Sequence, residues 1–434
     1  MLVGPDPTVG PHQHFGRTLP VARTWVGRSC VPTSQHKARK SARQFRYRQE
    51  VGLPTRHKLG RWSVVLIGCG LLASLPALAQ LRPHPGQSGE SAMSLLARIR
   101  ASSNVAYSGY AESHGSLPVP DVAQLGDLPA LLGDTTKMRV WALGTIATRV
   151  DDIDPLGETD TYVHGQTGGT NESVVTWNSQ ARTATTVTGT SSVRAPRAGD
   201  LLPSSLGRRL VADIEGTTTV RIASRRVAGR TAQGVRLQPE GTGTIDHVDI
   251  WADTATGLPL AVEITPLGAS RPALATTFLD LSLDAPKAGT TEFTPPSGSV
   301  TRQVNATDLQ GLLGRLLLFP YPTSLGNLPA TQEVRGLAAV ATYGNALRTI
   351  VVTRLSPNDA DRFARATSAA SLPVTDIDGA QAQSIDTPLV NALLVRKNGV
   401  DFLLAGTVPL TDLRSAYETL STIPLPQRRG PERS

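Results

Sequence analysis

Apolar and polar residues alternate along much of the chain between residues 107 and 284. A first run places Met138, Val140 and Ala142 on one side and continues through Ile146 and Val150. Later runs repeat the period of two, and their apolar members are Val248, Ile250, Ala252, Leu260, Val262, Ile264, Leu279, Leu281 and Leu283. This period is typical of β-strands that bury one face and leave the other in water. We therefore predict a sheet with an apolar face.

Turn residues separate these runs at short intervals. The segment 253–259 contains Thr256-Gly257-Leu258-Pro259, in which the glycine permits a positive φ and the proline starts the next strand. Asp154-Pro155-Leu156-Gly157 has the same composition after the run that ends near Val150. Neighbouring runs should pair as hairpins, which predicts an antiparallel meander and not βαβ units.

Two segments have helical spacing and could cover the apolar face. Residues 91–103 place Ala92, Leu95, Leu96 and Ile99 on one stripe. The second segment, 201–211, has a weak stripe interrupted by Gly207. Because each apolar side chain gains about 1.5–3 kcal/mol on full burial, the face cannot stay in water. Either a further loop closes over it, or an apolar ligand enters, or the core is filled by its own side chains.

A smaller α+β domain is predicted over residues 330–422, after a Pro-rich linker at 296–329 and before a disordered tail at 423–434. Residues 347–355 have the composition of a strand, and Ser356-Pro357 is a helix start, since serine caps and proline suits the first helical position. Lys397-Asn398-Gly399 predicts a type I′ hairpin turn. A last helix should begin at Pro409.

These motifs together resemble a known family. Tyr107-Ser108-Gly109-Tyr110 after an amphipathic helix, and residues 248–260, look like the LolA-like lipoprotein-carrier half-barrel. Residues 343–347 and 404–409 are similar to the second domain of MucB/RseB regulators of sigma-E-type anti-sigma factors. The resemblance covers about 90 to 422. It implies an α+β protein with an antiparallel LolA-like half-barrel and helical lid at 90–295, followed by the smaller domain.

The resemblance also implies a ligand and a partner. The half-barrel would accept acyl chains of a lipid or lipoprotein, and the smaller domain would contact a membrane anti-sigma factor or a transporter. Residue by residue, only the apolar strand face and the hairpin at 253–259 carry over, and they are structural elements more than a site. We predict that the acyl-chain site is lined by Leu95, Leu96, Ile99, Val140, Ala142, Ile146, Val248, Ile250, Leu260, Val262, Ile264, Leu279 and Leu281.

The N-terminal segment predicts export. A basic approach (Arg56, Lys58, Arg61) leads into an apolar run and then Ala77-Leu78-Ala79-Gln80, which is the order of a signal peptide with an A-x-A cleavage site. The same residues 62–80 are long enough for an uncleaved anchor, and Leu66-Ile67-Gly68-Cys69 also matches a lipobox. With a cleaved signal peptide, an anchor or a lipidated cysteine alike, the chain after residue 80 is expected to be extracytoplasmic.

Charge is concentrated before this export segment. Residues 1–61 hold 12 of the 43 Lys and Arg but 2 of the 35 Asp and Glu, so the later part is nearly neutral and we predict no nucleic-acid binding. This basic leader has no apolar period and is expected to be disordered; a start at Val51 would shorten it. Both cysteines, Cys30 and Cys69, precede residue 81, so the exported part must fold without disulfides.

No catalytic or cofactor motif appears after residue 80. The histidines His84, His114, His164 and His247 are isolated in sequence, and no activated-nucleophile motif is present. The string Asp152-x-Asp154-x-Leu156-Gly157, with Asp160 nearby, lacks the ligands of an EF-hand loop. It is interpreted as a hairpin turn with solvated acids. We predict no metal site, no cofactor and no enzyme.

Three functions remain open from the sequence. The first is a regulator that binds a lipid or lipoprotein, senses the state of the envelope and contacts a membrane anti-sigma factor or similar partner. The second is a lipid or lipoprotein carrier that acts beside an envelope transporter. The third is a structural envelope protein with a filled core.

Overall fold

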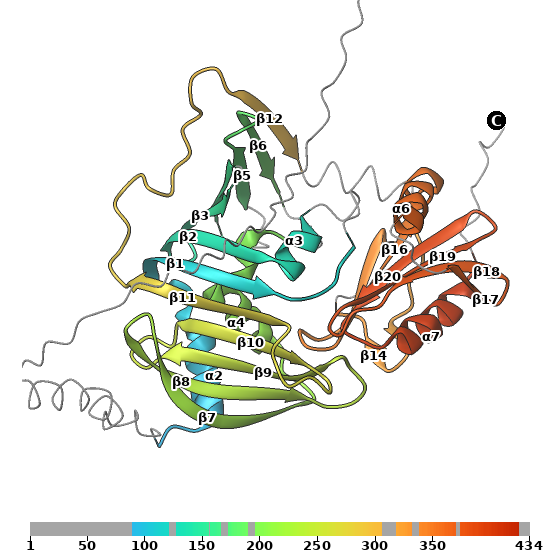
Figure 1. Ribbon diagram of the computed structural model, residues 1–434, viewed down its shortest axis with the longest axis horizontal. Helices are drawn as coiled ribbons and strands as arrows, with labels where there is room; N and C mark the ends of the chain where they lie inside the picture. The colour runs from blue at the N-terminus through green and yellow to red at the C-terminus, as the bar shows by residue number, and fades with distance from the viewer. Residues whose placement is uncertain are drawn as a thin grey trace, which may run out of the picture. The chain divides into compact units, whose positions relative to one another are not determined.

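The computed structural model describes residues 89–120, 127–155, 157–165, 172–189, 196–305, 318–331, 338–369 and 374–424. The predicted leader 1–61, the export segment 62–80 and nearly all of the tail 423–434 lie outside these residues. Within the described parts, no helix is both long and apolar enough to cross a membrane. The fold is α+β, with one large mixed sheet and a separate antiparallel sheet (Figure 1).

The large sheet is built from two meanders that meet at β1 and β11. The chain first runs outward, each strand pairing with the next, through β1 (Ala106–Gly115), β2 (Thr135–Leu143), β3 (Ala147–Asp154), β4 (Gly157–His164), β5 (Ser173–Asn178) and β6 (Thr183–Thr188). It returns from the opposite edge through β7 (Thr217–Val227), β8 (Arg230–Pro239), β9 (Ile245–Asp253), β10 (Pro259–Pro266) and β11 (Leu274–Ser282). The predicted antiparallel meander is confirmed for these strands.

The predicted turn at 253–259 has the backbone that its residues suggested. Gly257 has a φ of +75°, and a Cβ there would lie 2.7 Å from the carbonyl oxygen of Arg98. A glycine is therefore required both by the turn and by the close approach of the helix that carries Arg98.

Helices cover one face of the large sheet. The predicted first helix is α2 (Ala92–Ala101), whose cap Ser91 accepts a hydrogen bond from the Ser94 backbone N–H at 3.1 Å. It is followed by η1 (Ser102–Asn104), α3 (Leu128–Gly133), η3 (Ala198–Leu201) and α4 (Pro203–Ala212). In Figure 1, α2 and α4 lie side by side across strands β7 to β11.

The second covering helix, α4, lies closer to the sheet than its sequence suggests. A Cβ on Gly207 would meet the Cβ of Pro259 at 2.7 Å and a methyl group of Val262 at 3.4 Å. The glycine therefore permits direct packing of α4 on β10, and it does not weaken the cover. Leu206, Leu210 and Val211 are buried beside it.

The chain after β11 differs from the predicted linker 296–329. Residues Val300–Asn305 form β12, which pairs in parallel with β6 and makes the sheet mixed. Further along, Phe319, Tyr321, Leu325 and Leu328 are buried in the core of the smaller domain. These stretches are parts of folded layers because their apolar side chains and backbone groups find partners there.

The smaller domain contains a six-stranded antiparallel sheet between two helices. The sheet is formed by β15 (Val340–Gly344), β16 (Thr349–Leu355), β17 (Val374–Ile377), β18 (Ala380–Ile385), β19 (Asn391–Lys397) and β20 (Val400–Gly406). The short pair β13 (Ser324–Leu325) and β14 (Leu328–Pro329) precedes it. The helices are α6 (Pro357–Ala369) and α7 (Leu410–Ser421).

Three sequence predictions are confirmed in this domain. Ser356 precedes α6, and its hydroxyl accepts a hydrogen bond from the Asp359 backbone N–H at 3.2 Å. Asn398 and Gly399 both have positive φ, as a type I′ turn requires. Leu413, Tyr417 and Leu420 of α7 pack on one face of the sheet, whereas Phe363 of α6 packs on the other.

Candidate functional site

The predicted lipid-lining residues are mostly packed into the core of the large domain. Ten of the thirteen are at most 6% exposed and lie between the sheet and the two covering helices. These ten are Leu95, Leu96, Ile99, Val140, Ala142, Val248, Ile250, Leu260, Val262 and Ile264. Their role in lipid binding stays a prediction.

Two of the thirteen lie outside this core, and the assignment of Ile146 and Leu279 to the apolar face is wrong. Ile146 is 73% exposed because it belongs to the turn between β2 and β3, where strand alternation has ended. Leu279 is 53% exposed because β11 contains a bulge: Phe278 pairs with Ala111 and Asp280 with Tyr110, which leaves Leu279 unpaired and turned outward. Leu281, beyond the bulge, is partly buried against the core.

Of the alternatives left open for covering the apolar face, a core filled by the protein's own side chains holds over β9, β10 and β11. There α2 supplies three buried apolar side chains and α4 supplies Leu206, Leu210 and Val211. Close packing at Gly207 brings α4 onto β10, and these side chains pack together in the core between the helices and the sheet.

A cavity of about 410 Å³ lies further along the same sheet, over β3 and β4. Its floor includes Thr148, Val150, Thr161 and Val163, which point to the side covered by η3 and α4. None of the thirteen predicted residues lines it. The complete lining is Ser103, Gly144, Thr145, Ala147, Thr148, Val150, Thr161, Val163, Gly165, Arg197, Gly199, Asp200, Leu202, Ser205, Arg208 and Arg209.

The chemistry of this cavity is amphipathic and electropositive. Aliphatic side chains and threonine methyl groups form the floor, and Arg197, Arg208 and Arg209 stand on the wall formed by η3 and α4. Asp200 is the acidic residue of the lining, and its carboxylate lies 3.8 Å from the Arg209 guanidinium. A net positive wall above an apolar floor suits a ligand that joins an acyl chain to an anionic group.

A buried pair of hydroxyl groups lies near Arg208, one of the residues that line the cavity. The Tyr107 and Ser204 hydroxyls are 2.6 Å apart, and the Tyr107 ring packs edge-on against Phe278. Burial raises the pKa of Tyr107, and the neighbouring Arg208 guanidinium opposes that shift. Tyr107 is therefore a neutral residue whose hydroxyl is hydrogen-bonded to Ser204.

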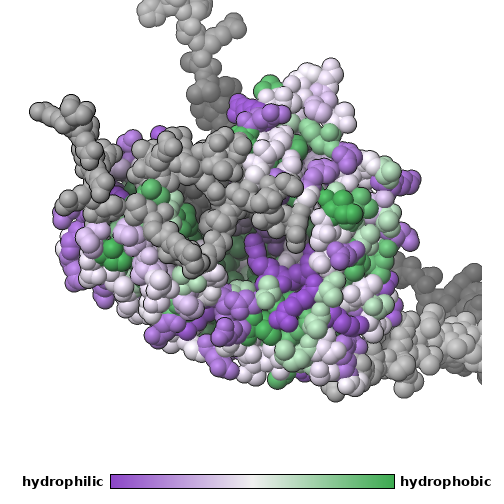
Figure 2. All heavy atoms as spheres, turned by 180° about the vertical axis from the view of Figure 1, so that it is seen from behind, coloured by the Kyte–Doolittle hydropathy of each residue, from purple (hydrophilic) through white to green (hydrophobic). Residues whose placement is uncertain are grey.

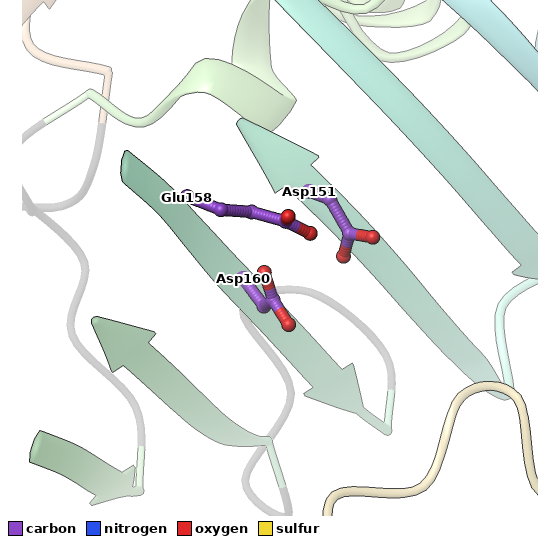
Figure 3. A group of neighbouring side chains, drawn as sticks. All are labelled: Asp151, Glu158 and Asp160. Atoms are coloured by element: carbon purple, nitrogen blue, oxygen red, sulfur yellow. The ribbon is translucent and has the colours of Figure 1, made fainter. Parts of the chain in front are cut away.

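On the opposite face of β3 and β4, three carboxyl groups converge (Figure 3). The β3–β4 hairpin places Asp151 directly across from Asp160, with Glu158 beside both. Asp151 is 2% and Asp160 7% exposed. The interpretation of this hairpin as a turn with solvated acids is therefore wrong for Asp160, although Asp154 is exposed.

Electrostatics in this cluster favour protonation of the carboxyl groups. Burial, and then the charge of Asp151, raises the pKa of Asp160 to about 7, while Arg149 opposes the shift. Burial also raises the pKa of Asp151, again against the effect of Arg149. The folded protein thus binds a proton that the unfolded chain would release near the ordinary pKa of 3.8.

The free energy of unfolding should fall as the pH rises from about 4 to 7. Because the folded state holds more protons between about pH 4 and 7, we expect the free energy of unfolding to be roughly 1–3 kcal/mol lower at pH 8 than at pH 5. Chemical denaturation in EDTA at both pH values would measure this. Burial also raises the pKa of Asp152 to about 6, so Asp160→Asn and Asp152→Asn should each remove part of the difference, whereas the exposed Asp280→Asn should keep it. Equal stability of the wild type at both pH values would contradict the shift.

The histidines that the structure describes remain apart from one another. His114 lies near Glu112, His164 near Glu292, and His247 near Asp246 and Asp249. Exposed large apolar residues are also scattered, and in Figure 2 the hydrophobic residues on the face shown are interrupted by hydrophilic ones.

Comparison with known proteins gives structural likeness only. No protein-family model matches the chain, and no curated protein matches it. The complex of MucA and MucB from Pseudomonas aeruginosa contains a chain that is similar over 76% of this chain and 97% of its own length, with 14% identity and a TM-score of 0.42.

Two smaller proteins are similar to part of the chain. A domain from Vibrio parahaemolyticus described as an outer membrane lipoprotein-sorting protein domain matches 45% of this chain and 94% of its own, with 13% identity and a TM-score of 0.22. A LolA superfamily protein from Nitrosomonas europaea matches 46% and 96%, with 13% identity and a TM-score of 0.20. Because all three TM-scores are below 0.5, these likenesses carry no argument about function.

Proposed function

We propose that this protein is a non-catalytic, extracytoplasmic binding protein for amphiphiles that carry an acyl chain and an anionic group. The observation that supports this proposal is the cavity over β3 and β4, which combines an apolar floor with a wall of three arginines. Its volume of about 410 Å³ is in the range of small-molecule sites. The ligand site of the proposal is this cavity, and the ten buried residues of the predicted trough form the rigid core behind it.

The proposed role is regulatory. The sequence resemblance to MucB/RseB proteins implies a membrane partner of the anti-sigma type, bound through the smaller domain. In such a regulator, the amphiphile would change the affinity for the partner, and the partner would change the affinity for the amphiphile by the same factor. A carrier that works beside a transporter would show ligand transfer without this reciprocal coupling.

Palmitate binding tests the proposed site. We expect the double variant Arg208→Glu, Arg209→Glu to weaken palmitate binding at least about tenfold, because reversed charges would repel the carboxylate from the cavity wall. Isothermal titration calorimetry on the purified full-length protein measures this affinity. Arg271→Glu changes an exposed arginine away from the cavity and should bind like the wild type.

A second variant tests the apolar floor. Val163→Phe would project a larger side chain into the cavity and should also reduce palmitate binding, whereas its melting temperature should stay close to that of the wild type. Unchanged palmitate affinity in both the charge-reversal variant and Val163→Phe, with both proteins folded, would refute the proposed site.

A further inference from the structure

The carboxyl cluster on β3 and β4 has more negative charge than its protein partners neutralise. Arg149 binds both oxygens of Asp151, through Nε at 2.6 Å and Nη2 at 2.9 Å, and Nη2 also contacts Asp160 Oδ2 at 3.1 Å. The Arg149 guanidinium therefore contacts two of the three carboxyl groups, and these two lie directly opposite each other in neighbouring strands. Arg139 is the cross-strand neighbour of Asp151 on β2, so two arginines stand against three carboxyl groups. Such cross-strand pairs of like charge are unfavourable unless something stands between them.

One oxygen of this cluster has no hydrogen-bond partner. Asp160 Oδ2 accepts from Arg149 and from the Tyr162 hydroxyl at 3.3 Å, but Oδ1 is buried and accepts from no group. The Asp160 side chain is 9% exposed, so bulk water does not compensate for the missing partner. A buried carboxylate oxygen of this kind points to a bound cation or proton at that position.

The geometry fits a cation of a particular class. One ligand oxygen from each of Asp151, Glu158 and Asp160 lies within 4.8 Å of the other two, which is about twice the distance of 2.3–2.6 Å between Ca²⁺ and its oxygen ligands. The donors are all carboxylates, which hard cations prefer, and no histidine or cysteine belongs to the group. An Asp151 oxygen that accepts from Arg149 still has a lone pair available.

We propose that Asp151, Glu158 and Asp160 form a binding site for a hard divalent cation of the Ca²⁺ type. The cation would lie between strands β3 and β4 on the face opposite the amphiphile cavity, with Asp160 Oδ1 as its central ligand. It would hold together the hairpin whose other face supplies the cavity floor. This proposal does not depend on amphiphile binding.

The aromatic surroundings supply a spectroscopic signal for the site. The Arg149 guanidinium lies over the rings of Trp141 and Tyr162, at 5.0 and 5.1 Å from their centroids. Phe293 packs against Tyr162 and Trp177. A cation that draws Asp160 and Asp151 inward would change the environment of Trp141 through Arg149, so its fluorescence reports occupancy.

Titration of the full-length protein with CaCl2 at pH 8, after removal of metals with EDTA, tests the proposal. We expect saturable binding with a Kd below about 1 mM, a change in tryptophan fluorescence and a higher melting temperature. At pH 5 all three effects should be lost, because cation and protons compete for the same oxygens. Asp160→Asn should weaken Ca²⁺ binding at least tenfold. Glu158→Gln should also weaken it at least tenfold, although this variant keeps both aspartates of the site.

The exposed Asp154→Asn serves as the matched control and should bind Ca²⁺ like the wild type. Two results would overturn the proposal. The first is the absence of heat, fluorescence change and thermal shift at 5 mM CaCl2 in the wild type, which would assign the cluster to proton binding alone. The second is Ca²⁺ binding that survives unchanged in both Asp160→Asn and Glu158→Gln.

Discussion

Ile250→Asp should unfold the large sheet and not simply abolish ligand uptake. Ile250 is fully buried in β9 between Val235 and Val262 on the neighbouring strands. The substitution loses about 1.5–3 kcal/mol of apolar burial and places an unpaired carboxyl group in the core, which costs several kcal/mol more. We expect a loss of at least about 4 kcal/mol, measured by circular dichroism during thermal or chemical denaturation.

The matched control for this variant is Leu279→Asp. The sequence pattern places Leu279 and Ile250 on the same apolar face, yet Leu279 is 53% exposed beside the bulge of β11. An aspartate there stays in water and should change stability by no more than about 0.5 kcal/mol. If Ile250→Asp were as stable as Leu279→Asp, the filled core between the helices and the sheet would be wrong.

Gly207→Val should separate α4 from β10. The Cβ would come within 2.8 Å of two carbons of the rigid Pro259 ring and close to Val262, so the helix or the strand must move. Overpacking of this kind costs about 1–3 kcal/mol, which exceeds the gain of a few tenths from replacing glycine within a helix. We expect a net loss of roughly 2 kcal/mol in the free energy of unfolding.

The displacement of α4 should also reach the cavity, because Arg208 and Arg209 follow Gly207 on the same helix. Palmitate affinity should therefore fall together with the melting temperature. Ala212→Val, at the exposed end of α4, provides the control and should leave both quantities nearly unchanged. A Gly207→Val protein that melts like the wild type would show that α4 does not pack tightly on β10.

Local chemistry predicted much of the fold from sequence. The cap at Ser356, the turn at Gly257 and the hairpin at Asn398-Gly399 depend on neighbouring residues, and the structure confirms all three. The bulge at Leu279 was not predictable in this way because it arises from pairing with β1, about 170 residues earlier in the chain. In the sequence, Gly207 likewise indicates a weakened helix. Only the structure shows that it permits the close contact with Pro259.

The two candidate sites differ in how far sequence could have located them. The turn at 154–157 pairs Asp154 with Gly157, and that register alone places Asp151 opposite Asp160. The acidic cluster could therefore have been found by following the predicted hairpin inward. The cavity could not have been found in this way, because its lining comes from η1, β3, β4, η3 and α4. The alternation of apolar and polar residues does not show that these elements lie together.

The parallel strand β12 has a consequence for the order of folding. It covers the outer side of β6, whose residues precede it by more than 110 positions, and becomes the edge strand itself. Until residues 300–305 have emerged and docked, the backbone amides and carbonyls along one side of β6 have no strand beside them, and such edges recruit other chains. Pairing of β12 with β6 is thus a contact between distant parts of the chain, which slows folding, and the newly synthesised polypeptide leaves one side of β6 open to other chains until that contact forms.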